Sequence, residues 1–200
     1  MKQWILPLGA LLLPALLGSA QAADTDGNYA VRGAGTLRCA DFFNEVSEGG
    51  GGAGVPAYVA WIDGYLTAHN RMTDATFDIS PLVSSAEVAA LARNLCRENP
   101  QLRLETTLAR IAGLFEPARV RQDSQLVLIR QGDQEVLIRQ ETLQRVQQAL
   151  EERGYDIVPS GGFDDATQQA LTRFQEQNDQ RVTGTPHADS VVRLLLMEGE

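Results

Sequence analysis

The side chains that most often carry out chemistry in proteins are scarce in this sequence. Its 200 residues contain two histidines and two cysteines, Cys39 and Cys96. Two scattered histidines cannot build a His-rich zinc site. A thiol nucleophile needs a base within reach, and nothing in the sequence places His69 beside either cysteine. We therefore expect no catalytic residue, no metal and no cofactor.

The first 22 residues have the pattern of a signal peptide. Lys2 precedes an apolar stretch at residues 5–17, and Ala20-Gln21-Ala22 has the spacing of a signal-peptidase site. The stretch is about 13 residues long, short of the ~20 that a spanning helix needs. We expect export to the bacterial periplasm or cell envelope, with no membrane span after cleavage. An uncleaved anchor is the alternative.

Export would determine the oxidation state of the two cysteines. Two thiols in an oxidising compartment most simply form one disulfide, here between Cys39 and Cys96. Closing the loop between these two cysteines stabilises the folded chain by about 4 kcal/mol in the chain-entropy model. A catalytic thiol is the alternative.

Composition excludes some classes of protein. The net charge is −9, from 17 basic and 26 acidic side chains. This argues against sequence-independent binding of nucleic acid, which needs a surplus of Lys and Arg. Residues 49–54 are glycine-rich and predict a flexible loop. They lack the Lys-Ser/Thr of a phosphate loop, so a nucleotide site is not expected there.

The fold class that we predict is mainly α, with two small helical domains and a hairpin or extended linker between them. After a flexible leader at 23–35, residues 36–118 form a helical disulfide domain. Apolar residues recur there at helical spacing in four segments, at residues 38–46, 55–70, 84–96 and 104–115.

The sequence also predicts roles for individual residues in this half. We expect Ser84 and Glu87 to form a capping box and Gly64 to permit close helix packing. Asp63 is expected to face water, with a buried functional carboxylate as the alternative. His69 is expected near a helix C-terminus, where positive charge is favoured, rather than as a ligand.

Residues 119–140 join the two halves. Residues 125–131 (QLVLIRQ) and 135–140 (EVLIRQ) are near-copies on either side of Gly132-Asp133, which predicts a β-hairpin. A continued helix is the alternative.

Residues 141–200 contain three predicted helices. The first covers residues 141–153 and has Gly154 in a C-cap position. Asp165 is the expected N-cap of the second helix, and Asp189 is the expected cap of the third.

The order of motifs in this segment resembles the peptidoglycan-binding three-helix domain often appended to cell-wall hydrolases. The resemblance covers about residues 137–197 and rests on Asp189 and five sequence blocks: 143–150 (LQRVQQAL), 154–156 (GYD), 162–167 (GFDDAT), 170–175 (ALTRFQ) and 182–184 (VTG). It implies that peptidoglycan is a partner and that Leu150 and Phe174 are core residues. It leaves four loop residues as candidate ligand contacts: Tyr155, Gly161, Gly162 and Phe163. The alternative is that these residues only pack the turn.

Residues 36–115 resemble the HdeA-type periplasmic helical disulfide proteins, which act as acid-stress chaperones. The residues concerned are 39–43 (CADFF), 61–66 (WIDGYL) and Cys96 before Asn99-Pro100. The resemblance implies the Cys39–Cys96 bridge. The glycine run and the WIDGY segment depart from the family pattern.

The sequence therefore favours an exported, non-catalytic envelope protein that associates with peptidoglycan through its C-terminal module. The first alternative is a periplasmic acid-stress chaperone, or another protein that binds periplasmic clients. Its 26 acidic side chains would titrate near pH 4. A cell-wall hydrolase is a further alternative, but it would need a zinc-ligand set, a Cys–His pair or a carboxylate pair.

Overall fold

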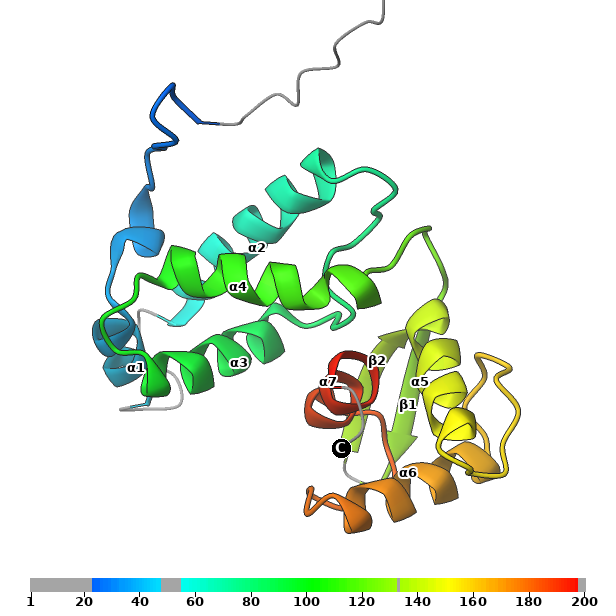
Figure 1. Cartoon of the computed structure of the whole chain (residues 1–200). Helices are drawn as coiled ribbons and strands as arrows, with labels where there is room; N and C mark the ends of the chain where they lie inside the picture. Colours follow the sequence, from blue (N-terminus) through cyan, green and yellow to red (C-terminus); the bar gives the residue numbers. More distant parts are fainter. Residues whose placement is uncertain (1–22, 48–54, 133, 198–200) are drawn as a thin grey trace, which may run out of the picture. The chain divides into compact units, whose positions relative to one another are not determined.

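The computed structural model describes residues 23–47, 55–132 and 134–197. The expected signal peptide and the glycine-rich loop lie outside these ranges. The chain divides at Ala30 into two units, and the helices and strands labelled in Figure 1 all belong to the second, which begins at Val31. In residues 23–30, the Asp24 carboxylate accepts the N–H groups of Asp26 and Asn28 at 3.0 and 2.7 Å, which closes a turn.

The described residues are mainly helical with one small antiparallel hairpin, which confirms the predicted fold class. In chain order the elements are η1 (Gly33–Thr36), α1 (Cys39–Ser47), α2 (Val55–Met72), α3 (Ser85–Glu98), α4 (Leu104–Phe115), η2 (Glu116–Ala118), β1 (Leu126–Gln131), β2 (Gln134–Arg139), α5 (Gln140–Glu152), α6 (Asp165–Gln177) and α7 (Ala188–Leu196). The four helices predicted in the N-terminal half all form, because each has an apolar face at helical spacing.

The predicted disulfide is present and joins α1 to α3. Cys39 and Cys96 are bonded and fully buried, so no thiol of this chain is left for the catalytic alternative. The Thr107 hydroxyl of α4 lies 3.1 Å from the Cys39 sulfur. On the same face of α1, Phe42 packs edge-on against Tyr58 of α2, with ring centroids 5.1 Å apart. The bridge therefore lies where three helices meet.

Trp61 of α2 is fixed by the short helix η1. Its indole N–H donates to the Arg32 carbonyl at 2.8 Å. A Cβ built on Gly35 would lie 2.1 Å from the indole ring, so only glycine fits at this point of contact. The C-terminal end of the expected leader, at residues 33–35, is thus part of η1 and packs on α2.

One expectation for a single residue in this half is wrong, and another holds only in part. Gly64 is exposed and a Cβ there would meet nothing within 4 Å, so it mediates no close packing. Ser84 is the N-cap of α3 by position, but its side chain makes no capping hydrogen bond, so of the expected capping box only the contact of the Glu87 carboxylate with the Ser84 backbone N–H forms. The neighbouring Ser85 hydroxyl donates instead to Asp63 of α2, and Asp63 faces water as expected.

The two near-copies form the predicted hairpin, with Gly132 in a left-handed conformation at the turn. The register places Leu128 opposite Leu137 and Ile129 opposite Val136. Ile129 and Ile138 are buried, whereas Leu128 and Leu137 point to the more exposed face. The sheet therefore has one core face and one open face, as the alternation of side chains along a strand requires.

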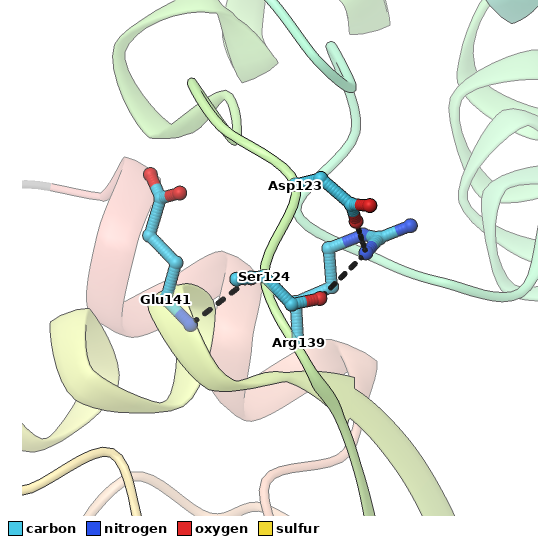
Figure 2. Close-up of polar contacts among 4 residues, drawn as sticks. All are labelled: Asp123, Ser124, Arg139 and Glu141. Atoms are coloured by element: carbon cyan, nitrogen blue, oxygen red, sulfur yellow. Dashed lines mark hydrogen bonds and ion pairs between the residues drawn. The ribbon is translucent and has the colours of Figure 1, made fainter.

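The segment before the hairpin is tied to the helix after it (Figure 2). Arg139 donates to the Asp123 carboxylate at 3.1 Å and to the Ser124 carbonyl at 2.9 Å. The Ser124 hydroxyl accepts the Glu141 N–H at 3.4 Å. Because the N-cap position of α5 makes no side-chain capping bond of its own, Ser124 caps that helix from a distant point in the sequence.

Candidate functional site

The C-terminal helices pack around one apolar layer. As predicted, Leu150 and Phe174 are buried. They share the layer with other buried side chains from all three helices: Leu143, Val146, Leu171, Val191 and Leu194. Core positions of this kind are not free to contact a ligand, so the candidate site must lie on the turns and on the outer face of a helix.

The helix caps lie at different residues from those predicted. Asp164, not Asp165, is the N-cap of α6, and its carboxylate accepts the Thr167 N–H at 2.8 Å and the Thr167 hydroxyl at 2.6 Å. These bonds hold the pKa of Asp164 below its ordinary value. His187, not Asp189, is the N-cap of α7, and its ring nitrogen accepts the Ser190 N–H. His187 therefore has a structural role.

A buried glutamine holds the turn before α6. Gln147 of α5 is fully buried, and its Oε1 accepts the Gly161 N–H at 2.7 Å. Its Nε2 donates to the Gly162 carbonyl and to the Thr167 hydroxyl, both at 2.8 Å. One amide thus bonds three polar groups, two of which, on Gly161 and Thr167, belong to buried residues.

A second buried glutamine holds the turn before α7 in the same way. Gln175 of α6 accepts the N–H groups of Thr183 and Gly184 at 2.8 and 2.9 Å. It donates to the Thr185 carbonyl at 2.8 Å and to the Ser190 hydroxyl at 3.0 Å. Both turns of the module are therefore fixed from inside. Sequence reasoning missed these roles, although each glutamine follows a core leucine by four residues on the inward helix face.

The first predicted contact residue, Tyr155, lies against the C-terminal half of α6. It is partly buried, its hydroxyl donates to Gln177 at 2.5 Å, and the Arg173 guanidinium lies 5.9 Å from its ring centroid. Burial raises the pKa of its phenol. Tyr155 is therefore held in place with part of its ring open to solvent.

The other three predicted residues directly precede α6. Gly161 is buried, has a φ of +74°, and its N–H is already bonded to Gln147. Gly162 is exposed, and Phe163 is partly buried. The structure thus separates the predicted residues into two groups. Gly161 to Phe163 lie at the N-terminus of α6, and Tyr155 lies near its C-terminal end, about 15 Å along the axis at 1.5 Å per residue.

One face of α6 is slightly hollow. It is lined by five side chains of α6: Asp165, Gln168, Gln169, Thr172 and Arg173. Their spacing puts them on one face of the helix, opposite the buried residues. Sequence reasoning had not singled out this face. We call the surface formed by these five residues with Tyr155, Gly162 and Phe163 the α6 strip.

The described residues contain no group of three or more His, Cys, Asp or Glu side chains able to hold a metal ion. Among the helices within those ranges, none is long and apolar enough to cross a membrane.

The C-terminal part of the molecule is thus a three-helix module with two internally fixed turns and an elongated polar face. Residues 139–189 match a family model described as "Putative peptidoglycan binding domain". The match runs from the last residue of β2 into the first turn of α7 and covers about a quarter of the chain. No curated protein and no solved structure matches this chain. The resemblance of residues 36–115 to HdeA-type proteins remains a prediction.

Proposed function

We propose that this protein is a non-catalytic protein of the bacterial cell envelope that associates with peptidoglycan through residues 141–200. The observation that carries the proposal is the family match at residues 139–189. In this proposal residues 36–118 form the helical disulfide domain, and residues 119–140 connect it to the module. The signal-peptide pattern and the disulfide support export to an oxidising compartment.

The form of the α6 strip supports a linear, polar ligand. Peptidoglycan is a polymer whose sugars and stem peptides present hydroxyl, amide and carboxylate groups. Gln168, Gln169 and Thr172 offer matching donors and acceptors, and Arg173 offers a cation. Aromatic rings at both ends, Tyr155 and Phe163, would pack on sugar faces. Gly161 would shape the turn, because its N–H is already used.

Co-sedimentation with purified peptidoglycan sacculi tests the proposal. The protein should be purified from cells that export it, so that any signal peptide has been removed. We expect this form to pellet with sacculi at low salt. Tyr155→Ala and Arg173→Ala should each weaken binding about five- to tenfold, the effect of losing one good polar or aromatic contact. Arg110→Ala, which removes an exposed arginine of α4, is the matched control and should bind like the unaltered protein.

Two results would overturn the proposal. One is protein that stays in the supernatant while a known binder pellets. The other is release of soluble muropeptides from sacculi, which would make the protein a hydrolase. Circular dichroism of each variant checks that lost binding does not come from unfolding.

A further inference from the structure

The edge of β1 is open. β2 is covered on its outer side, since Val136, Leu137 and Ile138 line a small pocket with Pro81, Leu82 and other residues from outside the hairpin. Among the described residues, neither strand forms a backbone hydrogen bond outside the hairpin, and β1 contributes no side chain to this pocket. Unpaired strand edges readily accept another strand. The edge of β1 is therefore available for pairing.

The backbone groups that face outward from β1 follow from the hairpin's own bonds. The Gln140 N–H donates to the Gln125 carbonyl at 2.8 Å, which makes residues 125 and 140 a hydrogen-bonded pair. Hydrogen-bonded and non-hydrogen-bonded pairs alternate along an antiparallel ladder. The observed register then makes 127–138, 129–136 and 131–134 the bonded pairs. The N–H and carbonyl groups of Leu126, Leu128 and Arg130 consequently point away from β2.

Two of these residues, Leu126 and Leu128, carry exposed apolar side chains. Leu126 and Leu128 are 50% and 45% exposed, and Leu137 beside them on β2 is 42% exposed. An apolar cluster of this kind on an exposed strand marks an interaction surface.

The duplicated sequence indicates what fits this edge. Residues 127–131 and 136–140 both read VLIRQ. In the hairpin, one copy pairs antiparallel with the other, with Leu128 opposite Leu137 and Leu126 opposite Arg139. Because Leu137 and Arg139 correspond to Leu128 and Arg130 in the duplication, β1 can repeat these pairs with another β1. The hairpin register thus shows that this sequence pairs with its own copy.

We propose that β1 pairs antiparallel with β1 of a second copy of this chain, with Leu128 opposite Leu128 of the partner subunit. This arrangement bonds all three outward-facing residues of each strand. It places Leu126 opposite Arg130 of the partner subunit, as Leu126 lies opposite Arg139 within the hairpin. A continuous stripe of leucines then crosses the four-stranded sheet, and Leu137 ends it on each side.

Charge and existing hydrogen bonds favour this register over those shifted by two residues in either direction. A pairing centred on Arg130 would set two arginines directly opposite each other, which is destabilising. A pairing centred on Leu126 would require Ser124, whose carbonyl and hydroxyl are already bonded to Arg139 and Glu141. With Leu128 at the centre, each Arg130 keeps its own partner, Glu135 at 2.7 Å.

Sedimentation velocity and cysteine cross-linking test the proposal. An edge contact is smaller than a standard interface, so we expect a dimer that forms between about 10 and 500 μM. Leu128→Pro should abolish it. Proline removes an outward N–H that the hairpin does not use, so the β1–β2 pairing should survive.

Cross-linking distinguishes the register. The native cysteines are bonded to each other, so an introduced thiol is the only free one. Mild oxidation should link Leu128→Cys at least about tenfold more than Leu126→Cys, since two Leu126 positions would lie about 13 Å apart along the strands. A monomer at all concentrations, or equal cross-linking of the two variants, would overturn the proposal. If Leu128→Pro unfolds, the cross-linking comparison alone still tests the proposed dimer. Neither measurement involves sacculus binding, so the dimer can fail without affecting the proposed function.

Discussion

The side chain of Gln147 and the backbone of Gly161 are joined by a hydrogen bond of 2.7 Å inside the C-terminal module. This bond connects α5 to the turn that begins the α6 strip. Gln147 is fully buried and Gly161 nearly so. If this bond is broken, no water molecule can take its place, because both the donor and the acceptor are buried. The position of the turn, and of Gly162 and Phe163 with it, therefore depends on one amide.

Replacing that amide by a hydrocarbon should unfold the module more easily. Gln147→Leu leaves the Gly161 N–H, the Gly162 carbonyl and the Thr167 hydroxyl without this partner. We expect the free energy of unfolding to fall by about 2–4 kcal/mol. Gln148→Leu, at an exposed position of the same helix, should change it by less than about 0.5 kcal/mol. Urea denaturation followed by circular dichroism measures both, and equal effects would show that the buried bonds contribute little.

A comparison of two glycines separates backbone strain from steric clash. Gly154 and Gly161 both have positive φ angles, of 87° and 74°. A Cβ at Gly154 meets nothing within 4 Å, whereas a Cβ at Gly161 lies 2.8 Å from a side-chain carbon of Gln140. Gly154→Ala should therefore lower stability by about 1 kcal/mol, and Gly161→Ala by clearly more. Thermal unfolding of the two variants tests this order, and a reversed order would contradict the packing described at the turn.

The identity of the α6 cap predicts a pH-dependent difference between adjacent residues. Asp164→Ala should lower stability at pH 7 by about 1 kcal/mol, and Asp165→Ala by a few tenths at most. Hydrogen bonds from Thr167 lower the folded-state pKa of Asp164 below its ordinary value of 3.8. The stabilisation is therefore present above about pH 4 and is lost as the pH falls through the folded-state pKa. Unfolding at pH 7 and pH 3 should show the Asp164→Ala deficit shrinking, and a constant deficit would argue against a charged cap.

Loss of the disulfide should destabilise the N-terminal helices. The bridge between Cys39 and Cys96 spans 57 residues. In the chain-entropy model its removal lowers the free energy of unfolding by about 4 kcal/mol. We expect the Cys39→Ala/Cys96→Ala variant to unfold at lower denaturant concentration and to be insensitive to reductant. The unaltered protein should shift toward it when reduced, and coincident curves with and without reductant would contradict this.

Much of the fold follows from periodicity. The prediction of a helix at residues 104–115 agrees with α4 at both ends. Leu104, Leu108 and Ile111 define one apolar face, and Pro117 follows its end. The hairpin was equally clear, since two β-branched runs flank a glycine. Both signals are local, so neighbouring residues suffice to read them.

The errors concern features that depend on backbone angles or on distant contacts. Asp164 and Asp165 are equivalent in sequence, and only the extended backbone of Asp164 makes it the cap. A glycine within an apolar helix suggested close packing at Gly64, but a Cβ there would meet no described atom within 4 Å. The α6 strip was missed because polar residues on an outer helix face are common. The internal hydrogen bonds of Gln147 and Gln175 were not predicted, because the apolar pattern of a helix leads one to expect only apolar side chains on its inward face.

The capping of α5 by Ser124 has a practical consequence for anyone who wishes to transplant the module. A fragment cut at residue 141 would lack the hydroxyl that accepts the Glu141 N–H, and also Ile129 and Ile138 of the buried hairpin face. Arg145 of α5 also donates to the carbonyls of Pro117 and Arg119 at 2.6 and 3.0 Å. A graft that keeps these contacts therefore starts near residue 117 and carries the hairpin with it.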